Sequence, residues 1–90
     1  QEEITGSKEG KIAAAKALGA SDDQSSVDLL LRFVDDADDD VVFAACESLR
    51  KVGSEHDTAD LLARMQKIPE DRQAIRDEIG KTVQELHHRP

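Results

Sequence analysis

The side chains of this chain that could carry out chemistry are few, and the first is its single cysteine, Cys46. Cys46 lies among apolar residues at helical spacing, and no histidine lies on the same predicted helix to act as a base. A cysteine in that setting is typically a small buried hydrophobic residue, and a single one cannot form an internal disulfide. Ser48 has no triad partners, and the five glycines are too widely spaced to cradle a phosphate. These residues therefore predict no catalytic site.

Metal binding would have to come from the acidic run at residues 35–40 or from the three histidines. A calcium loop needs a glycine at its sharp turn and a glutamate at its twelfth position, but the run has no glycine and its twelfth position is Cys46. His87 and His88 are neighbours in the sequence, so on a helix their side chains point about 100° apart and cannot coordinate the same ion. We predict no metal and no cofactor, and interpret the run as the cap of a helix that begins at Asp39. A weaker functional interpretation is an acidic edge that attracts a basic partner.

Composition and charge exclude further classes of function. The 90 residues include 20 acidic and 12 basic side chains, which give a net charge of −8 that opposes binding to nucleic acid. The two aromatic residues are both Phe, so stacking platforms for bases are missing. No apolar run approaches the roughly 18 residues of a membrane span, and no signal peptide opens the chain. The lone thiol and the acidic balance favour a cytoplasmic location, and the absent initiator Met leaves open that the chain is a fragment of a longer one.

The elements that must position these residues are helices. The apolar residues are mainly Ala, Leu, Val and Ile, and five glycines and two prolines are too few for a chain of many tight turns. We predict an all-α fold in a single domain, with a frayed lead-in at residues 1–7 and helices at about 8–20, 25–34, 39–52, 57–67 and 70–87.

Local signals predict how these helices begin, end and pack. Ser25 is the expected N-cap of the second helix, and Gly53 stands where a left-handed C-terminal residue belongs. Pro69 fits the first turn of the last helix, because its missing N–H costs nothing there. The expected buried residues are Ile12, Ala15, Leu18, Val27, Leu30, Leu31, Val34, Val42, Ala45, Cys46, Leu49, Val52, Leu61, Leu62, Met65, Ile68, Ile75, Ile79, Val83 and Leu86.

The chain superposes on itself when it is shifted by 31 residues. The shift places residues 12–18 (IAAAKAL) on residues 43–49 (FAACESL), and residues 30–34 on residues 61–65. A fixed period of this size indicates one helical unit stacked on copies of itself, because a lone helix pair cannot bury its apolar face. The third copy of the pattern, at residues 74–80, is degenerate, which is typical of a capping helix.

Residues 39–53 (DDVVFAACESLRKVG) resemble the second helix of a HEAT-like repeat, and residues 54–65 are similar to the first helix of the next unit. The subtype is the one also found in phycobiliprotein lyases. The resemblance extends over about residues 8–83 and implies an α–α superhelix (solenoid) of two helix pairs and a capping helix. The chain departs from the family pattern at Val42, where arginine is common, and at Arg50, where a small residue is usual.

A candidate binding surface follows from the second helix of each unit. Phe43, Glu47 and Arg50 recur at spacings of four and three, and the 31-residue shift carries the last two onto Glu78 and Lys81. Second helices form the inner, concave wall of stacked helix pairs, where such proteins bind partners. We therefore predict that these five residues bind a protein partner, with Phe43 as an apolar anchor. The alternative is that Phe43 packs against the neighbouring repeat.

Two functional hypotheses remain from the sequence. The first is a non-catalytic protein–protein interaction scaffold that binds a basic or amphipathic partner segment on the concave helical face, because residues 25–53 carry half of the net negative charge. The alternative is a subunit or fragment of a chromophore-lyase-like repeat enzyme, which only the resemblance supports. Neither nucleic acid nor a membrane is an expected partner. A homodimer through the exposed repeat ends, such as the helix at residues 8–20, is a further expectation.

Overall fold

The computed structural model describes residues 8–21 and 23–88. Its elements are the α-helices α2 (Lys8–Leu18), α3 (Gln24–Val34), α4 (Asp39–Val52), α5 (Thr58–Gln66) and α6 (Gln73–His87), with the 3₁₀ turn η1 (Glu55–Asp57) before α5. The described residues contain no strand, so the all-α prediction is confirmed. The lead-in predicted at residues 1–7 lies outside the described residues.

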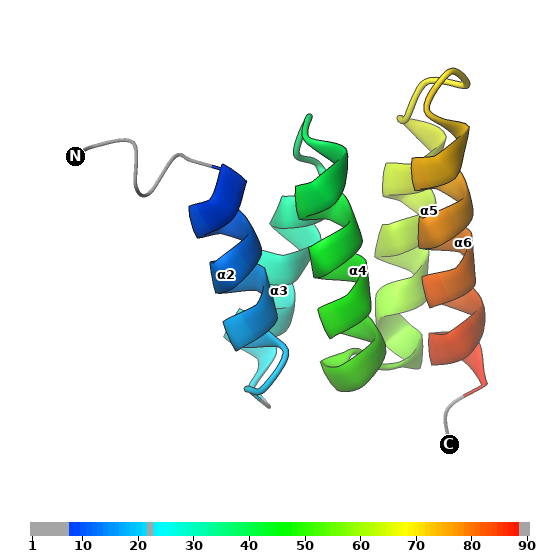
Figure 1. The fold of residues 1–90 in the computed structure, drawn as a ribbon. Coiled ribbons are helices and arrows are strands. Elements are labelled where there is room, and N and C mark those ends of the chain that lie inside the picture. Colours follow the sequence, from blue (N-terminus) through cyan, green and yellow to red (C-terminus); the bar gives the residue numbers. More distant parts are fainter. Residues whose placement is uncertain (1–7, 22, 89–90) are drawn as a thin grey trace.

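The helices form two layers (Figure 1). Helices α2, α4 and α6 lie side by side in one layer, and α3 and α5 lie behind them. Helix α4 contacts α2 on one side, α6 on the other and α3 behind, so it is the most enclosed element. This arrangement confirms the predicted stack of helix pairs. Within the described ranges, no helix has the length and apolar character needed to span a membrane.

Helix α4 has the bounds that its sequence predicts. The Asp38 carboxylate accepts a hydrogen bond from the Asp40 backbone N–H at 3.1 Å, and Asp39 and Asp40 lie in the first turn. Arg50 and Lys51 lie in the last turn. Negative side chains at the N-terminus and positive ones at the C-terminus both complement the helix dipole, so both ends are specified locally.

Two helix starts differ from the prediction. The N-cap of α3 is Asp23 rather than Ser25, and its carboxylate accepts from the Ser26 backbone N–H at 3.1 Å. The hydrogen bonds from Ser26 lower the pKa of Asp23, because they favour the charged carboxylate. Helix α6 begins at Gln73, three residues later than predicted, because Pro69 lies in a turn closed by the Arg72 N–H and the Pro69 carbonyl at 3.0 Å.

Gly53 does not adopt the left-handed conformation that its place after α4 suggested. Its φ is −74° and its ψ is 173°, which is extended backbone. A Cβ atom there would lie 2.8 Å from the Leu49 carbonyl oxygen and 3.0 Å from Leu86 Cδ1. A side chain at Gly53 is therefore opposed first by the Leu49 carbonyl of its own helix and then by Leu86 of α6, and the predicted left-handed conformation was wrong.

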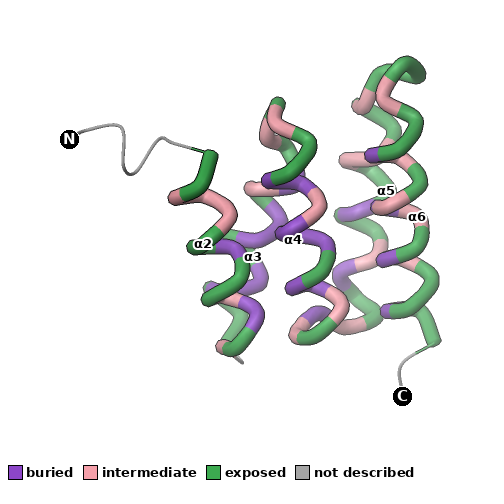
Figure 2. The backbone as a smooth tube through the Cα atoms, in the orientation of Figure 1, coloured by how far each residue is buried: buried purple, intermediate pink, exposed green. Residues whose placement is uncertain are grey.

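The core follows the predicted stripes (Figure 2), but one expected residue is exposed and six are only partly buried: Ile12, Leu18, Val52, Met65, Ile68 and Val83. All four apolar residues expected to be buried on α3 are buried, and Leu49, Leu61, Ile75, Ile79 and Leu86 are fully buried. Leu62 is the exposed residue, at 40% exposure, although Leu31, at the equivalent repeat position, is 4% exposed. The difference arises because Leu31 lies inside the stack, whereas no described element covers Leu62. Helix α4 also buries Val41, Ala44 and Ser48, because it has helices on two sides.

Candidate functional site

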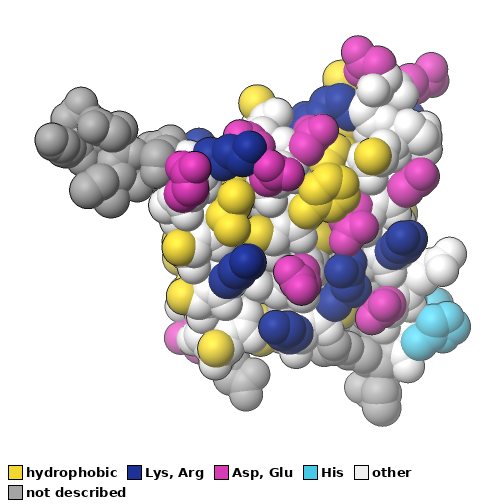
Figure 3. Space-filling model, in the orientation of Figure 1, with side chains coloured by type: hydrophobic (Ala, Val, Ile, Leu, Met, Phe, Trp, Pro, Cys, Tyr) yellow, Lys and Arg dark blue, Asp and Glu magenta, His cyan; other side chains and the backbone are white. Residues whose placement is uncertain are grey.

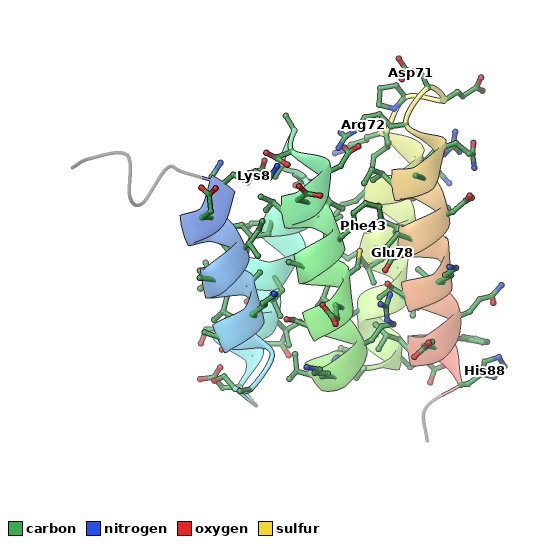
Figure 4. All side chains as sticks on the ribbon, viewed as in Figure 1. Lys8, Phe43, Asp71, Arg72, Glu78 and His88 are labelled. Carbon is green, nitrogen blue, oxygen red and sulfur yellow. The ribbon has the colours of Figure 1, made fainter. Side chains whose placement is uncertain are left out.

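The candidate anchor Phe43 is half-buried on α4, where it packs against the core and still reaches the surface. Figure 4 shows its ring between α4 and α6, and Figure 3 shows hydrophobic side chains on this face of the layer. The equivalent residues are Ile12 on α2, which is half-buried, and Ala74 on α6, which is exposed. These three residues form an apolar row that crosses the α2–α4–α6 face.

A second row across the same face is charged. Lys16 and Glu47 are exposed at equivalent positions of α2 and α4. The third member, Glu78, is only 17% exposed at its side chain and pairs with Arg50, whose Nη1 lies 2.7 Å from Glu78 Oε2. The exposed charges of this row therefore include both signs and do not form a uniformly acidic surface.

Arg50 and Glu78 were predicted as partner-binding residues, and the structure brings them together as an ion pair between α4 and α6. Arg50 Nη1 also donates to Thr82 Oγ1 at 3.1 Å. Burial by itself would lower the pKa of Arg50, but the hydrogen bond and charge of Glu78 outweigh it and raise that pKa. The two side chains thus pair with each other and hold the helix pair α5–α6, which we call the second unit, to the helix pair α3–α4, the first unit.

Lys81, the fifth predicted residue, is exposed and belongs to a groove whose lining includes neither Phe43 nor Glu47. This groove is open, has a volume of about 820 Å³ and lies at the surface of α5 and α6. The lining residues are Met65, Glu70, Gln73, Arg76, Asp77, Gly80, Lys81 and Gln84. The five predicted residues therefore do not form one site: two lie on the face, two form an internal ion pair and one lies in the groove.

The acidic run is paired with basic side chains from other elements. Lys8 Nζ lies 2.7 Å from Asp40 Oδ2, and Lys11 Nζ lies 2.8 Å from Asp36 Oδ2. From the second unit, Arg64 pairs with Asp35, and Arg72 Nη2 lies 2.5 Å from Asp39 Oδ1. We call the five carboxylates of this run, Asp35, Asp36, Asp38, Asp39 and Asp40, the acidic hub.

The acidic hub has a structural role that the sequence interpretation did not include. Its ion pairs connect α2, α5 and the residue before α6 to the turn between α3 and α4 and to the first residues of α4, near Lys8 and Arg72 in Figure 4. The hydrogen bond from Lys11 lowers the pKa of Asp36, because it favours the carboxylate. Carboxylates already paired within the molecule attract a basic partner less than free ones would.

The side chains that could react or bind a metal lie in surroundings that do not favour such chemistry. Cys46 is fully buried, and burial raises the pKa of its thiol to about 11, so the nucleophilic thiolate does not form at neutral pH. His56 contacts Ser54 Oγ at 3.1 Å, and His87 Nδ1 lies 3.8 Å from Glu55 Oε2. Across residues 8–21 and 23–88, no three His, Cys, Asp or Glu side chains are grouped to hold a metal ion.

Two further features were missed by the sequence interpretation. Ser48 Oγ donates to the Ala15 carbonyl at 2.7 Å, and a Cβ at Gly19 would lie 2.5 Å from Ser48 Oγ. This contact holds α2 closely against α4. The sequence carries a signal for it, because Ser48 replaces Ala17 under the 31-residue shift. The groove at α6 was also missed, although its polar lining stands where α4 has apolar residues.

Comparison with known protein families gives one finding. A family model described as HEAT repeats matches residues 3–80, which is most of the chain. Neither a curated protein nor a solved structure matches the chain significantly. The family match does not identify the repeat subtype, so the resemblance to phycobiliprotein lyases stays a prediction.

Proposed function

Because this chain belongs to the HEAT-repeat family, we propose that it is a non-catalytic protein-interaction module that binds an amphipathic segment of a partner across α2, α4 and α6. HEAT repeats commonly mediate protein interactions, and the family is generally non-catalytic. A cytoplasmic location is part of the proposal and rests on the lone cysteine and the acidic balance alone.

The observation that supports the proposal best is the apolar row of Ile12, Phe43 and Ala74 beside charged side chains. Three helices each contribute one residue to the row, so an extended or helical segment that crosses them would meet apolar contacts at regular intervals. Lys16 and Glu47 border the row and offer one charge of each sign. An amphipathic segment fits this pattern better than a uniformly basic one, because a basic segment would meet Lys16.

The ion pair of Arg50 and Glu78 lies beside Phe43 on this face and is only partly exposed (Figure 4). It fixes α6 relative to α4, and therefore fixes the spacing of Phe43 and Ala74. A binding surface made of residues from several helices needs such fixed spacing, because each loosely held contact adds an entropic cost to binding.

The test uses Ala74→Glu, which places a charge in the apolar row. Ala74 is exposed in the first turn of α6, where an acidic residue suits the helix dipole, so the fold is expected to be unchanged. Ala63→Glu is the matched control, since Ala63 is exposed on α5 in the other layer. The purified variants are compared as baits in the lysate of the source organism, at low salt and at about 0.5 M salt.

The expected result is a captured protein that the Ala63→Glu variant retains and the Ala74→Glu variant loses. Because the row is apolar, most of the capture is expected to persist at about 0.5 M salt, where exposed charge pairs are largely screened. Capture that both variants retain, or that high salt abolishes completely, would contradict this binding face.

Phe43→Ala is a second test of the same face. Phe43 is half-buried against the core, so its loss is expected to cost about 2 kcal/mol of stability, less than the truncation of a fully buried Phe. The folded variant is expected to lose the captured protein. A loss of most of the thermal stability would instead identify Phe43 as a core residue and would remove it from the binding face.

A further inference from the structure

Three positions of the 31-residue repeat contact the next helix of the α2–α4–α6 layer. On α2 these positions are Lys8, Ala15 and Gly19. Lys8 pairs with Asp40, and both the Ala15 carbonyl and Gly19 meet Ser48 of α4.

One repeat later, the same three positions of α4 also contact the second unit, although only the first of them again makes an ion pair. Asp39 pairs with Arg72 just before α6, and Arg50 pairs with Glu78. Cys46 interacts with the Thr82 side chain. These three positions therefore form the edge on which the next helix of the layer packs, and we call it the docking edge. Helix α4 packs on the docking edge of α2, and α6 packs on that of α4.

In α6 and the turn before it, these positions are Glu70, Asp77 and Lys81, and all three line the open groove of about 820 Å³. The groove is thus the docking edge of the second unit, in register with the edge that α6 itself occupies on α4. Gly80 takes the place of Leu49, and a Cβ there would meet nothing within 4 Å. No helix among residues 8–21 and 23–88 fills this place.

The lining of the groove defines what would fill it. The apolar Val42, Cys46 and Leu49 of α4 are replaced by Gln73, Asp77 and Gly80, so the groove is polar and has room at its centre. Met65 is its apolar contribution from α5. The two ion pairs between α4 and the second unit indicate the charges that would face the groove. Since Glu78 faces Arg50, an acidic residue would face Lys81. Since Arg72 faces Asp39, a basic residue would face Glu70.

We propose that this groove binds a helix of a partner protein that carries an acidic residue opposite Lys81, a basic residue opposite Glu70 and a hydrogen-bond donor opposite Asp77. The site is separate from the α2–α4–α6 face and does not depend on it. Continuity with the two filled docking edges and the charge pattern of the lining carry the proposal.

A second copy of this chain is a poorer occupant. In head-to-tail stacking, α2 of the second copy would pack on α6 as α6 packs on α4. Lys16 of that copy would then take the position that Glu78 takes opposite Arg50. Lys16 and Lys81 are both exposed and would then face each other as like charges. The contact that joins α4 to α6 thus becomes repulsive between copies.

The test uses a synthetic peptide with the sequence of residues 72–88 and the substitution Ile79→Ser. In the peptide, Arg72 is intended to pair with Glu70 of the protein, and Glu78 with Lys81. The serine at position 79 is intended to donate its hydroxyl to Asp77, at the repeat position from which Ser48 donates to α2. Binding to the full chain is followed by the amide NMR signals of Gly80 and Gln84, up to about 1 mM peptide, because an isolated short helix is marginal and binds weakly. The matched control peptide adds Glu78→Lys.

We expect the peptide to shift the groove signals, and Lys81→Glu in the protein to weaken binding about threefold or more. The Glu78→Lys peptide is expected to bind the Lys81→Glu protein more tightly than it binds the wild type, which a purely structural effect of Lys81→Glu would not produce. The proposal is overturned if no groove signal shifts, if both peptides bind both proteins equally, or if the shifts fall on the α2–α4–α6 face. Self-association of the wild type at about 0.1 mM that shifts the Gly80 and Gln84 signals would also overturn it, in favour of a second copy as the occupant.

Discussion

Helices α4 and α6 occupy equivalent places in consecutive units, but the edges that they present to the next helix differ in character. On α4 this edge is apolar and filled: Cys46 and Leu49 are fully buried under the second unit. On α6 the equivalents Asp77 and Gly80 line an open, polar groove. The two helices hold equivalent places in the repeat, so their edges differ in the side chains they carry and in whether a described helix is stacked on them.

The comparison shows that a repeat position has no fixed burial of its own. Leu31 and Leu62 have the same residue type and the same position in the 31-residue repeat, and yet one is 4% exposed and the other 40%. Burial depends on whether another element stacks on that edge. The stability of each position is therefore a property of the contact between units, and exchanging residues between the two edges tests this.

The largest effect is expected from moving the polar residue into the filled edge. Cys46→Asp places a carboxylate at a site with no exposure, and we expect a loss of about 3–5 kcal/mol or failure to fold. Asp77→Cys, the reciprocal change in the open groove, is expected to stay within about 0.5 kcal/mol of the wild type. Urea unfolding followed by circular dichroism measures both. Similar losses in the two variants would contradict the comparison.

A smaller effect is expected at alkaline pH, again only at the filled edge. The folded protein keeps the Cys46 thiol protonated up to a pKa of about 11, against an ordinary value of 9.0. Between pH 9 and 11 the unfolded chain therefore loses a proton that the folded chain retains, and stability falls as pH rises, by about 2 kcal/mol in total. Cys46→Ala should lack this decline. Melting temperatures measured from pH 8 to 11 that fall equally in both proteins would exclude Cys46 as the cause.

The two glycines Gly19 and Gly80 give a matched pair with opposite expected signs. Gly19→Ala forces a Cβ to within 2.5 Å of Ser48 Oγ, so it is expected to cost about 1–2 kcal/mol through overpacking. Gly80→Ala adds a Cβ in open space within α6 and is expected to stabilise the protein by about 0.5–1 kcal/mol. Thermal unfolding of both variants measures the difference. A loss at Gly80 would mean that its edge is filled in solution.

The smallest effect is expected at the acidic hub. Lys11→Gln removes the partner of Asp36 and should cost less than about 1 kcal/mol, because the pair is partly exposed. The pKa of Asp36 is lowered in the folded state, so its stabilising effect is present above the ordinary carboxyl pKa and is lost as pH falls through the lowered value. The variant should thus differ from the wild type at pH 7 but converge with it in strong acid. A gap that persists there would contradict this role.

Periodicity and caps were sufficient to predict the fold class and the bounds of α4. Apolar residues at spacings of three and four identified the buried side of α3, and aspartates before Val41 located the start of α4. The start of α3 was harder because Asp23 and Ser25 are both good cap residues and lie two positions apart. A charged acceptor that reaches the Ser26 N–H is favoured over a neutral one there.

The candidate site could be predicted only in part, because contacts between helices decide it. Arg50 and Glu78 are 28 residues apart, and nothing local to either residue shows that they pair. The prediction for Gly53 failed because its backbone is extended, and a Cβ there would meet both the Leu49 carbonyl of α4 and Leu86 of α6. The 31-residue shift does contain the docking edge, but its meaning depends on knowing which edges are filled.

The contrast between the two seams of the layer also has a mechanical consequence. At the seam between α2 and α4, Gly19 and the backbone carbonyl of Ala15 lie directly against Ser48, so two backbones are nearly in contact. The seam between α4 and α6 is joined in part by the ion pair of Arg50 and Glu78, which holds the spacing at rest but acts through two long side chains with several rotatable bonds. If the chain is pulled along the stack, we expect the α4–α6 seam to stretch and separate first, while α2 and α4 stay together as the stiffer part of the layer.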